Sequence, residues 1–172
     1  MNKLTTRGFS LLEVLITMLL VTVGVLGMVA MQGRAIQYSQ DSVERTHAAT
    51  LAYELLEMVR ASPSGLDVAN SPLLFSSLPA SGSSTCFEID TNALLEEQIG
   101  CWASRARTLL PGADSLASRF EACISAAPGV CDPTGSGAAL EVRMAWNASG
   151  EGCLDASDLD GALCTFTFRT QI

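Results

Sequence analysis

The sequence predicts an α+β protein in which one long N-terminal helix packs on a small antiparallel β-sheet. Two observations lead to this prediction. The first third of the chain contains no proline before Pro63, and its composition favours an unbroken helix. The last third contains short segments in which apolar and polar residues alternate, as they do in half-buried strands. Short strands with local connections favour antiparallel pairing, and a helix can cover the apolar face of such a sheet.

The composition argues against several classes of function. The chain has 172 residues, which is room for one small domain beside a membrane segment. Its net charge of -8 argues against a nucleic-acid-binding surface. The sequence has no Ser-His-Asp set, Walker loop or Cys-x-x-Cys zinc pattern, and His47 is its only histidine. We therefore expect neither an enzyme nor a bound cofactor or metal ion.

A membrane-spanning half of the helix is predicted at residues 9–33. The preceding residues 1–8 form a short basic leader with Lys3 and Arg7, and residues 14–31 carry no charge. As a helix rising 1.5 Å per residue, the segment 9–33 is about 38 Å long, enough to cross a hydrocarbon core of about 30 Å. The positive-inside rule places the leader in the cytoplasm and the rest of the chain outside, as a single-pass protein.

An amphipathic half of the helix is predicted at residues 34–61. This segment has no proline and no glycine, and its apolar residues recur at helical spacing, which predicts one apolar stripe. Asp41 and Arg45 are expected to pair on the polar side, as are Glu57 and Arg60. The stripe comprises Ile36, Val43, Leu51, Leu55 and Met58 or Val59.

The remaining residues, 62–172, are predicted to form a globular head. A loop rich in Ser, Pro and Gly is expected at 62–85, with an apolar island at Leu73–Phe75 and Leu78. A short strand is expected at 86–90. A second helix is expected near 93–110, with Asn92 as its N-cap. Its inward residues would be Leu94, Leu95, Ile99, Trp102, Ala106 and Leu109.

The clearest strand signals lie near the C-terminus. Leu140, Val142, Met144 and Trp146 alternate with Glu141, Arg143 and Ala145, and Cys164, Phe166 and Phe168 alternate with polar residues. The segment 118–125 fits either a strand or a helix.

All six cysteines lie in the last half of the chain, which indicates disulfides and an oxidising compartment such as a periplasm. Pairing sequence neighbours closes short loops, although other connectivities remain open and one pair can stay reduced. The pairing of Cys153 with Cys164 is favoured most, because these residues flank one loop before the last strand. The other two neighbour pairs are Cys86 with Cys101 and Cys123 with Cys131.

The most specific motif is the junction Gly8-Phe9-Ser10-Leu11-Leu12-Glu13. A carboxylate inside a membrane span is costly, so Glu13 indicates a function. Gly8 has no side chain and lets a peptidase approach the backbone closely. Cleavage after Gly8 would free an amine on Phe9 that is mostly protonated at neutral pH. Glu13 lies one helical turn further on, and pairing the two charges would offset part of their burial cost.

Two simpler interpretations of the N-terminus compete with this one. A secretory signal peptide has a shorter apolar core followed by a small-residue cleavage site, and neither feature matches. A plain uncleaved anchor explains the length and orientation, but it does not explain the Gly8–Phe9 junction. In that case Glu13 would merely extend to the membrane interface.

The junction resembles the processing site of type IV prepilins and of the related pseudopilins of type II secretion. The whole chain resembles type IV pilin-like proteins, most specifically over residues 7–62. Within that family, segments 24–28 and 51–61 look most like the PilV group of minor pilins, and the turn 109–112 and the strand 142–146 are similar but weaker. Major pilins commonly have a proline inside the apolar helix, which this chain lacks.

The resemblance implies cleavage between Gly8 and Phe9 by a prepilin peptidase, N-methylation of Phe9, and a role for Glu13 in assembly. It implies a minor pilin in the inner membrane that meets an assembly platform, other minor pilins and the major pilin. Such a subunit would prime or cap a surface fibre used for twitching motility or adhesion. The alternatives are a pseudopilin of the type II secretion piston and an adhesive subunit of the pilus tip.

Two weaker motifs lie in the head. Asp155, Asp158 and Asp160 could offer oxygen ligands to calcium, but their spacing does not match an EF-hand, and a solvated acidic loop is the simpler interpretation. Asn147-Ala148-Ser149 matches the N-glycosylation sequon, a short motif that often occurs by chance.

Overall fold

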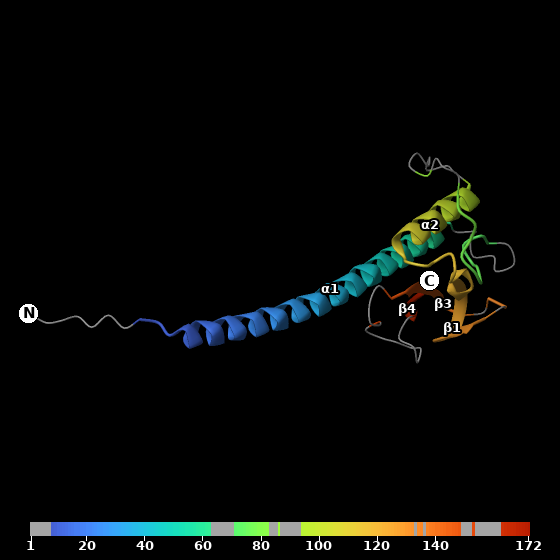
Figure 1. The fold of residues 1–172 in the computed structure, drawn as a ribbon. Helices are drawn as coiled ribbons and strands as arrows, with labels where there is room; N and C mark the ends of the chain where they lie inside the picture. The colour runs from blue at the N-terminus through green and yellow to red at the C-terminus, as the bar shows by residue number, and fades with distance from the viewer. Residues whose placement is uncertain are drawn as a thin grey trace, which may run out of the picture. The chain divides into compact units, whose positions relative to one another are not determined.

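The protein has the predicted α+β architecture, with a long N-terminal helix and a small antiparallel sheet (Figure 1). The structure is a computed structural model that describes residues 8–62, 71–82, 86, 94–132, 134–135, 137–148, 153 and 163–172. The chain divides into two compact units, Met1–Tyr38 and Ser39–Ile172. Helix α1 (Leu11–Ala61) contributes to both of them.

Helix α1 starts slightly later than the predicted Phe9. Its first turn is closed by the Ser10 carbonyl, which accepts hydrogen bonds from the backbone N–H groups of Glu13 and Val14 at 3.0 and 3.3 Å. The helix ends at Ala61, as predicted from the Ser62-Pro63 sequence, since a residue before proline avoids the α conformation.

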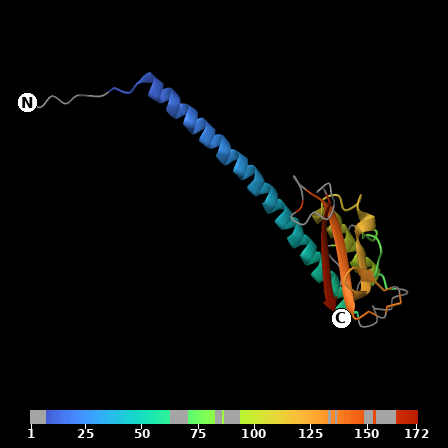
Figure 2. The same cartoon turned by 90° about the horizontal axis from the view of Figure 1, so that it is seen from below.

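In the second unit, the sheet has the strand order β2-β1-β3-β4 and is antiparallel throughout. Its longest pairing joins β3 and β4, whose register runs from Ala139↔Gln171 to Asn147↔Leu163. Figure 2 shows these two strands side by side. The strands are β1 (Glu121–Ala127), β2 (Val130–Cys131), β3 (Ala139–Asn147) and β4 (Leu163–Gln171).

The segment 118–125, for which the sequence left two possibilities, is mostly strand. A short 3-10 helix, η2 (Ala117–Arg119), precedes β1, and Phe120, Ala122 and Ile124 are buried in alternation. The apolar island also joins the sheet: the backbones of Phe75 and Ala122 exchange hydrogen bonds of 2.9 and 2.8 Å.

The core of the second unit lies between the sheet and two helices. Helix α2 (Leu95–Leu109) packs beside the C-terminal half of α1, and the indole N–H of Trp102 donates to the Leu51 carbonyl at 2.9 Å. Burying each large apolar side chain stabilises the fold by about 1.5–3 kcal/mol. The fully buried side chains include Leu51, Leu55, Trp102, Phe120, Leu140, Val142, Met144 and Trp146.

The predicted apolar stripe of α1 is correct only in its C-terminal part. Leu51, Leu55 and Val59 are buried, whereas Ile36 and Val43 are exposed, Val43 by 51%. The helical repeat explains Val43, because a step of eight residues before Leu51 turns about 80° away from it. Glu44, seven residues before Leu51, is turned by only about 20° and occupies the buried face instead.

The prediction for Asp41 was half right. Its carboxylate pairs with Arg45 Nε at 3.0 Å, as predicted, but Asp41 is only 6% exposed and does not lie on a polar face. The Glu57–Arg60 pair is also confirmed, at 2.9 Å. Leu94 was predicted to point inward and is instead 76% exposed, because it occupies the N-cap position, where the backbone is extended rather than helical.

Strand β3 is buried on both faces. The sequence placed Glu141 and Ala145 opposite the apolar set, yet their exposed fractions are 2% and 0%. Both carboxylate oxygens of Glu141 accept the Gly129 N–H at 3.0 Å, so the turn between β1 and β2 covers this face. Ser125 and Arg143 add further hydrogen bonds to the carboxylate at 3.0 and 3.1 Å.

Several predictions fall outside the described residues. These are the strand residues 87–90, the acidic residues Asp155, Asp158 and Asp160, and Ser149 of the sequon. The prediction of Asn92 as the N-cap of the second helix is wrong, because α2 begins at Leu95 and its N-cap is Leu94.

Candidate processing and assembly site

The junction between Gly8 and Phe9 lies just before α1. Both residues are exposed and non-helical, and the Phe9 side chain is 83% exposed. A Cβ atom added to Gly8 would meet nothing within 4 Å. The fold of the described residues therefore does not require glycine at this position.

Glu13 lies in the first turn of α1. An acidic residue there is favoured by the helix dipole, which is a structural reason for a carboxylate. Among the residues that the structure describes, no hydrogen bond or ion pair of the Glu13 side chain is seen. The carboxylate follows Phe9 by four positions in the sequence, but Phe9 precedes α1 and is not helical, so the two residues do not share a helix face in this structure.

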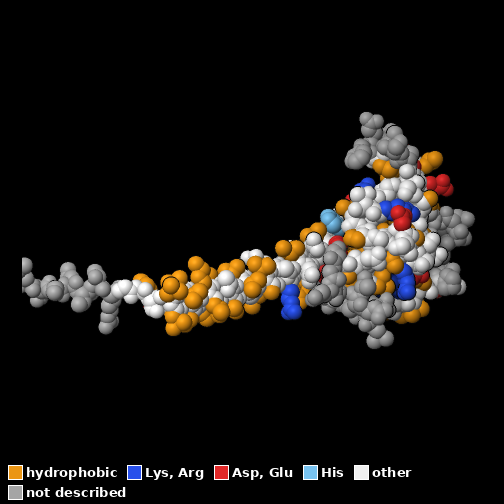
Figure 3. Space-filling model, viewed as in Figure 1, with side chains coloured by type: hydrophobic (Ala, Val, Ile, Leu, Met, Phe, Trp, Pro, Cys, Tyr) orange, Lys and Arg blue, Asp and Glu red, His pale blue; other side chains and the backbone are white. Residues whose placement is uncertain are grey.

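The apolar half of α1 is uncovered in the described structure. Its most apolar 18-residue window has a mean hydropathy of 2.6, and none of that window is buried. Figure 3 shows apolar side chains along this part of the helix. The hydroxyls of Thr17 and Thr22 donate to the carbonyls of Val14 and Leu19 at 2.8 Å, so these polar groups are satisfied inside the helix. This helix is therefore a candidate membrane span by its length and composition.

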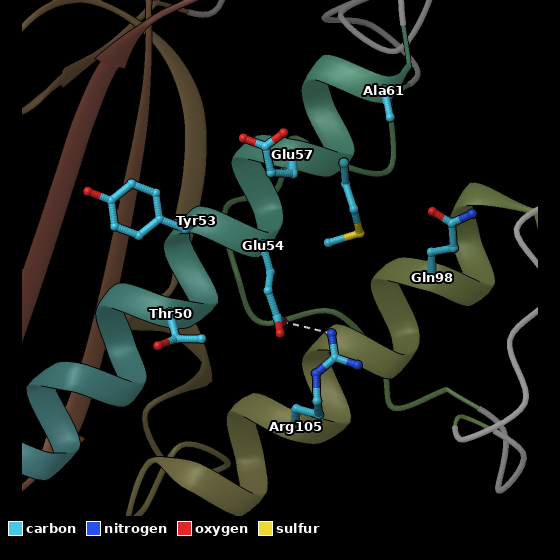
Figure 4. Close-up of a pocket in the computed structure, with 8 residues that line it drawn as sticks. Thr50, Tyr53, Glu54, Glu57, Ala61, Gln98 and Arg105 are labelled. Atoms are coloured by element: carbon cyan, nitrogen blue, oxygen red, sulfur yellow. Dashed lines mark hydrogen bonds and ion pairs between the residues drawn. The ribbon is translucent and has the colours of Figure 1, made fainter.

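The second unit has a groove of about 600 Å³ between α1 and α2 (Figure 4). Across it, Glu54 pairs with Arg105 at 2.8 Å, while the Tyr53 side chain points to the side of α1 where the strands lie. The groove is open, and its surface is mainly apolar although most of its lining residues are polar or charged. Its lining residues are Thr50, Tyr53, Glu54, Glu57, Met58, Ala61, Gln98 and Arg105.

Three disulfides hold the second unit together, and no cysteine is free. They are the sequence-neighbour pairs Cys86–Cys101, Cys123–Cys131 and Cys153–Cys164, with Cα separations of 5.4, 5.6 and 5.4 Å. The expectation that one pair could stay reduced therefore does not hold in this structure. Cys86–Cys101 ties residue 86 to α2, Cys123–Cys131 joins β1 to β2, and Cys153–Cys164 ties residue 153 to β4.

Three carboxylates among the described residues, those of Asp41, Glu44 and Glu141, are buried, which the sequence analysis did not predict. Charged side chains are mostly exposed in folded proteins, so the residue type alone gives no sign of burial. His47 is half-buried on α1 and lies beside Glu44 in a small surface hollow. Asn147 is exposed at the end of β3, where its N–H donates to the Pro111 carbonyl at 2.8 Å.

Comparisons with protein-family models, with curated proteins and with solved structures found no match to this chain.

Proposed function

We propose that this chain is a minor pilin of a type IV pilus, most like the PilV group. The observation that carries the proposal is Glu13, the only charge between Arg7 and Arg34, placed four residues after the Gly8–Phe9 junction on an uncovered apolar helix. The fold supports it, because a long helix shared by an apolar segment and a disulfide-bonded α+β unit suits a fibre subunit.

In this proposal, a prepilin peptidase at the cytoplasmic face of the inner membrane cleaves between Gly8 and Phe9. The new N-terminal amine of Phe9 is then methylated and keeps its positive charge. Before cleavage the amine does not exist, so Glu13 lacks this partner. Afterwards the carboxylate can pair with its own amine or with that of another subunit, and the pairing reduces the cost of both charges in lipid.

Pairing between subunits would set their axial register. An incoming helix that places its amine at Glu13 of a subunit already in the fibre is held at one height, because other positions leave the carboxylate unpaired. The membrane-spanning residues 9–33 then exchange lipid for the apolar helices of other minor pilins and the major pilin. An inner-membrane assembly platform would drive this exchange, and the second unit would end up at the cell surface.

The proposed role is structural: the subunit primes or caps the fibre rather than catalysing a reaction. The proposal is tested in a deletion strain complemented with the wild-type chain, with Glu13→Ala or with Thr17→Ala as a matched control in the same helix. We expect surface fibres and twitching motility with the wild type and the control, and a strong loss of both with Glu13→Ala. Normal fibres with Glu13→Ala would overturn the pairing role.

A pseudopilin of type II secretion shares the same N-terminal half and is the second candidate. The deletion strain separates the two, because loss of secretion with intact fibres would favour the piston. An adhesive subunit of the pilus tip is the third, and intact fibres with lost surface attachment would favour it.

A further inference from the structure

The three disulfides of the second unit differ in exposure. Cys101 and Cys164 are 0% exposed, so two of the disulfides each have one sulfur in the core. All six cysteines lie in the part of the chain that the structure describes, and only the Cys123–Cys131 pair has neither member buried. This is therefore the disulfide that a reactant in solution reaches most readily.

A hollow of about 260 Å³ opens beside this disulfide. Both of its cysteines line the hollow, together with residues that include Phe75, Glu121 and Asp132. One water molecule occupies about 30 Å³ in the liquid, so the hollow has room for a small thiol. A small nucleophile can therefore approach the sulfurs without prior unfolding of the second unit.

Thiol–disulfide exchange also releases a thiolate, which its surroundings have to stabilise. Burial in apolar surroundings raises the pKa of a thiol and so disfavours the thiolate, which applies to the cores around Cys101 and Cys164. A thiolate released at Cys164 would also lie 3.7 Å from a carboxylate oxygen of Asp41, and like charges repel. A thiolate released at Cys123 or Cys131 would instead face the open hollow.

The Cys123–Cys131 disulfide joins β1 to the shortest strand of the described sheet. Strand β2 has two residues and lies at the end of the sheet, and its pairing with β1 is irregular between Ser125 and Ala127. Beyond it, the Asp132 N–H donates to the Ile124 carbonyl at 2.7 Å. Few backbone hydrogen bonds can hold so short a strand, so the covalent link contributes much of what keeps β2 beside β1.

We propose that Cys123–Cys131 is a site of reversible exchange with a small dithiol, and that its reduction releases β2 from β1. This inference does not depend on which fibre or piston the chain serves.

The exchange has two steps. One thiolate of the dithiol attacks a sulfur of the disulfide, the Cys123–Cys131 bond breaks, and a mixed disulfide forms while the other cysteine leaves and takes up a proton. The second thiolate of the dithiol then attacks the mixed disulfide, and the remaining cysteine leaves and is protonated. Two electrons pass from the dithiol to the protein, the two thiol protons end on the cysteines, and the dithiol becomes a disulfide.

The charges around the hollow define which thiols react well. One carboxylate oxygen of Glu121 and the sulfurs of Cys123 and Cys131 all lie within 4.8 Å of one another, and Asp132 lines the same hollow. Arg143 offsets part of this negative charge, because it pairs with Glu121 at 3.1 Å. Like charges repel, so the site favours an uncharged or cationic thiol over an anionic one.

Release of β2 would also affect the buried carboxylate of Glu141. This carboxylate accepts a hydrogen bond of 3.0 Å from the Gly129 N–H, and Gly129 lies in the turn that the disulfide closes. When the turn moves away, the hydrogen bond is lost and this face of β3 is uncovered. We therefore expect faster amide hydrogen exchange at Gly129, Val130 and Cys131 in the reduced chain.

The first test treats the full chain in detergent micelles with dithiothreitol, an uncharged dithiol, and blocks new thiols with N-ethylmaleimide at successive times. Mass spectrometry of the peptides reports which cysteines are reduced. We expect Cys123 and Cys131 to be labelled at least tenfold faster than the other cysteines, while near-ultraviolet circular dichroism shows a folded second unit. Earlier labelling of either other pair, or labelling of all six at one rate, would overturn the proposal.

The charge preference is tested with cysteamine, a cationic thiol, and mercaptoethanesulfonate, an anionic one. Glu121→Gln should lower the ratio of their rates at Cys123 and Cys131 severalfold, because it removes the carboxylate nearest the sulfurs. An unchanged ratio would contradict the preference for an uncharged or cationic thiol.

Hydrogen exchange followed by mass spectrometry tests the release of β2. The double variant Cys123→Ser/Cys131→Ser imitates the reduced pair, and wild type reduced by dithiothreitol provides a second measurement should the variant fold poorly. In both we expect faster exchange at residues 128–132 than in the oxidised wild type, with unchanged exchange in the central part of β3 as the internal control. Exchange at 128–132 that stays as slow as in the oxidised chain would overturn the release of β2.

Discussion

A glycine at position 8 could be required by the fold or by a protein that binds this segment, and the structure argues against the first reason. The surroundings of Gly8 are open, so a side chain would not disturb the described fold. The neighbouring Phe9 is also exposed, and the helix begins only at Leu11. A requirement for glycine would then come from a protein that binds this segment, which is what a peptidase at the junction would impose.

We predict that Gly8→Val leaves the leader attached. The valine side chain would hinder close approach of the peptidase to the backbone, while α1 and the second unit fold as before. An immunoblot of membranes should show one slightly larger band. Ser10→Ala, two residues away, serves as the control and should be processed normally. A fully processed Gly8→Val chain would rule out this role for the glycine.

Glu141 illustrates how a buried charge is held. Burial raises the pKa of its carboxyl group, but hydrogen bonds from the Gly129 N–H, from Ser125 and from Arg143, together with the Arg143 charge, outweigh that effect. The pKa of Glu141 therefore lies below its ordinary value in the folded protein. Its contribution to stability is complete above the unfolded pKa, about 4.3, and is lost as the pH falls through the lower folded pKa.

We predict that Glu141→Gln lowers the free energy of unfolding by about 1–3 kcal/mol at neutral pH, because it weakens hydrogen bonds to donors that are buried or partly buried. The gap between wild type and variant should narrow as the pH falls below about 4. Urea unfolding in detergent at several pH values measures both effects. Glu121→Gln, at a more exposed carboxylate paired with Arg143, is the control and should cost less. A gap that stays constant down to the lowest pH would contradict the assignment.

At the scale of the elements, the packing of α1 decides which of its residues contribute to the stability of the second unit. Leu55 is fully buried against the core, whereas Val43 belongs to the predicted stripe and is exposed. Val43 and Leu55 looked alike in the sequence, because both lie close to helical spacing from Leu51. Val43 comes eight residues before Leu51, and Leu55 comes four residues after it. Only the sheet and α2, which are distant in sequence, determine which side of the helix is covered.

Leu55→Ala should therefore destabilise the second unit by about 2–5 kcal/mol, since it opens a cavity in a packed core. Val43→Ala is the matched control and should change stability by less than about 0.5 kcal/mol. Thermal unfolding in detergent, followed by near-ultraviolet circular dichroism, compares the two. Equal losses would mean that Val43 is buried by a contact that the described residues do not contain.

Much of the fold could be predicted because its signals are local. The length of α1, its end before Pro63, and strands β3 and β4 follow from residues adjacent in sequence. The burial of Glu141 could not be predicted, because it depends on the turn at Gly129 closing over the far face of β3. Likewise, the groove between α1 and α2 requires residues such as Glu54 and Arg105, which lie far apart along the chain. In contrast, the candidate site is proposed from sequence alone, because Gly8, Phe9 and Glu13 are neighbours, and its role stays a prediction.

At the scale of the whole molecule, the chain combines parts with opposite solvent requirements. The first unit exposes a long apolar helix. The second unit buries its apolar residues in a core and is cross-linked by three disulfides. A protein with both parts is suited to a membrane and an oxidising compartment in turn. The proposed passage from inner membrane to surface fibre meets these requirements in one pathway.

The most direct test of the proposed function is mass spectrometry of the N-terminal peptide of the chain in fibres sheared from cells. The proposal predicts that the chain is present in the sheared fraction, that its first residue is Phe9, and that the Phe9 amine carries one methyl group. A chain absent from that fraction and retained in the membrane with residues 1–8 attached would contradict it.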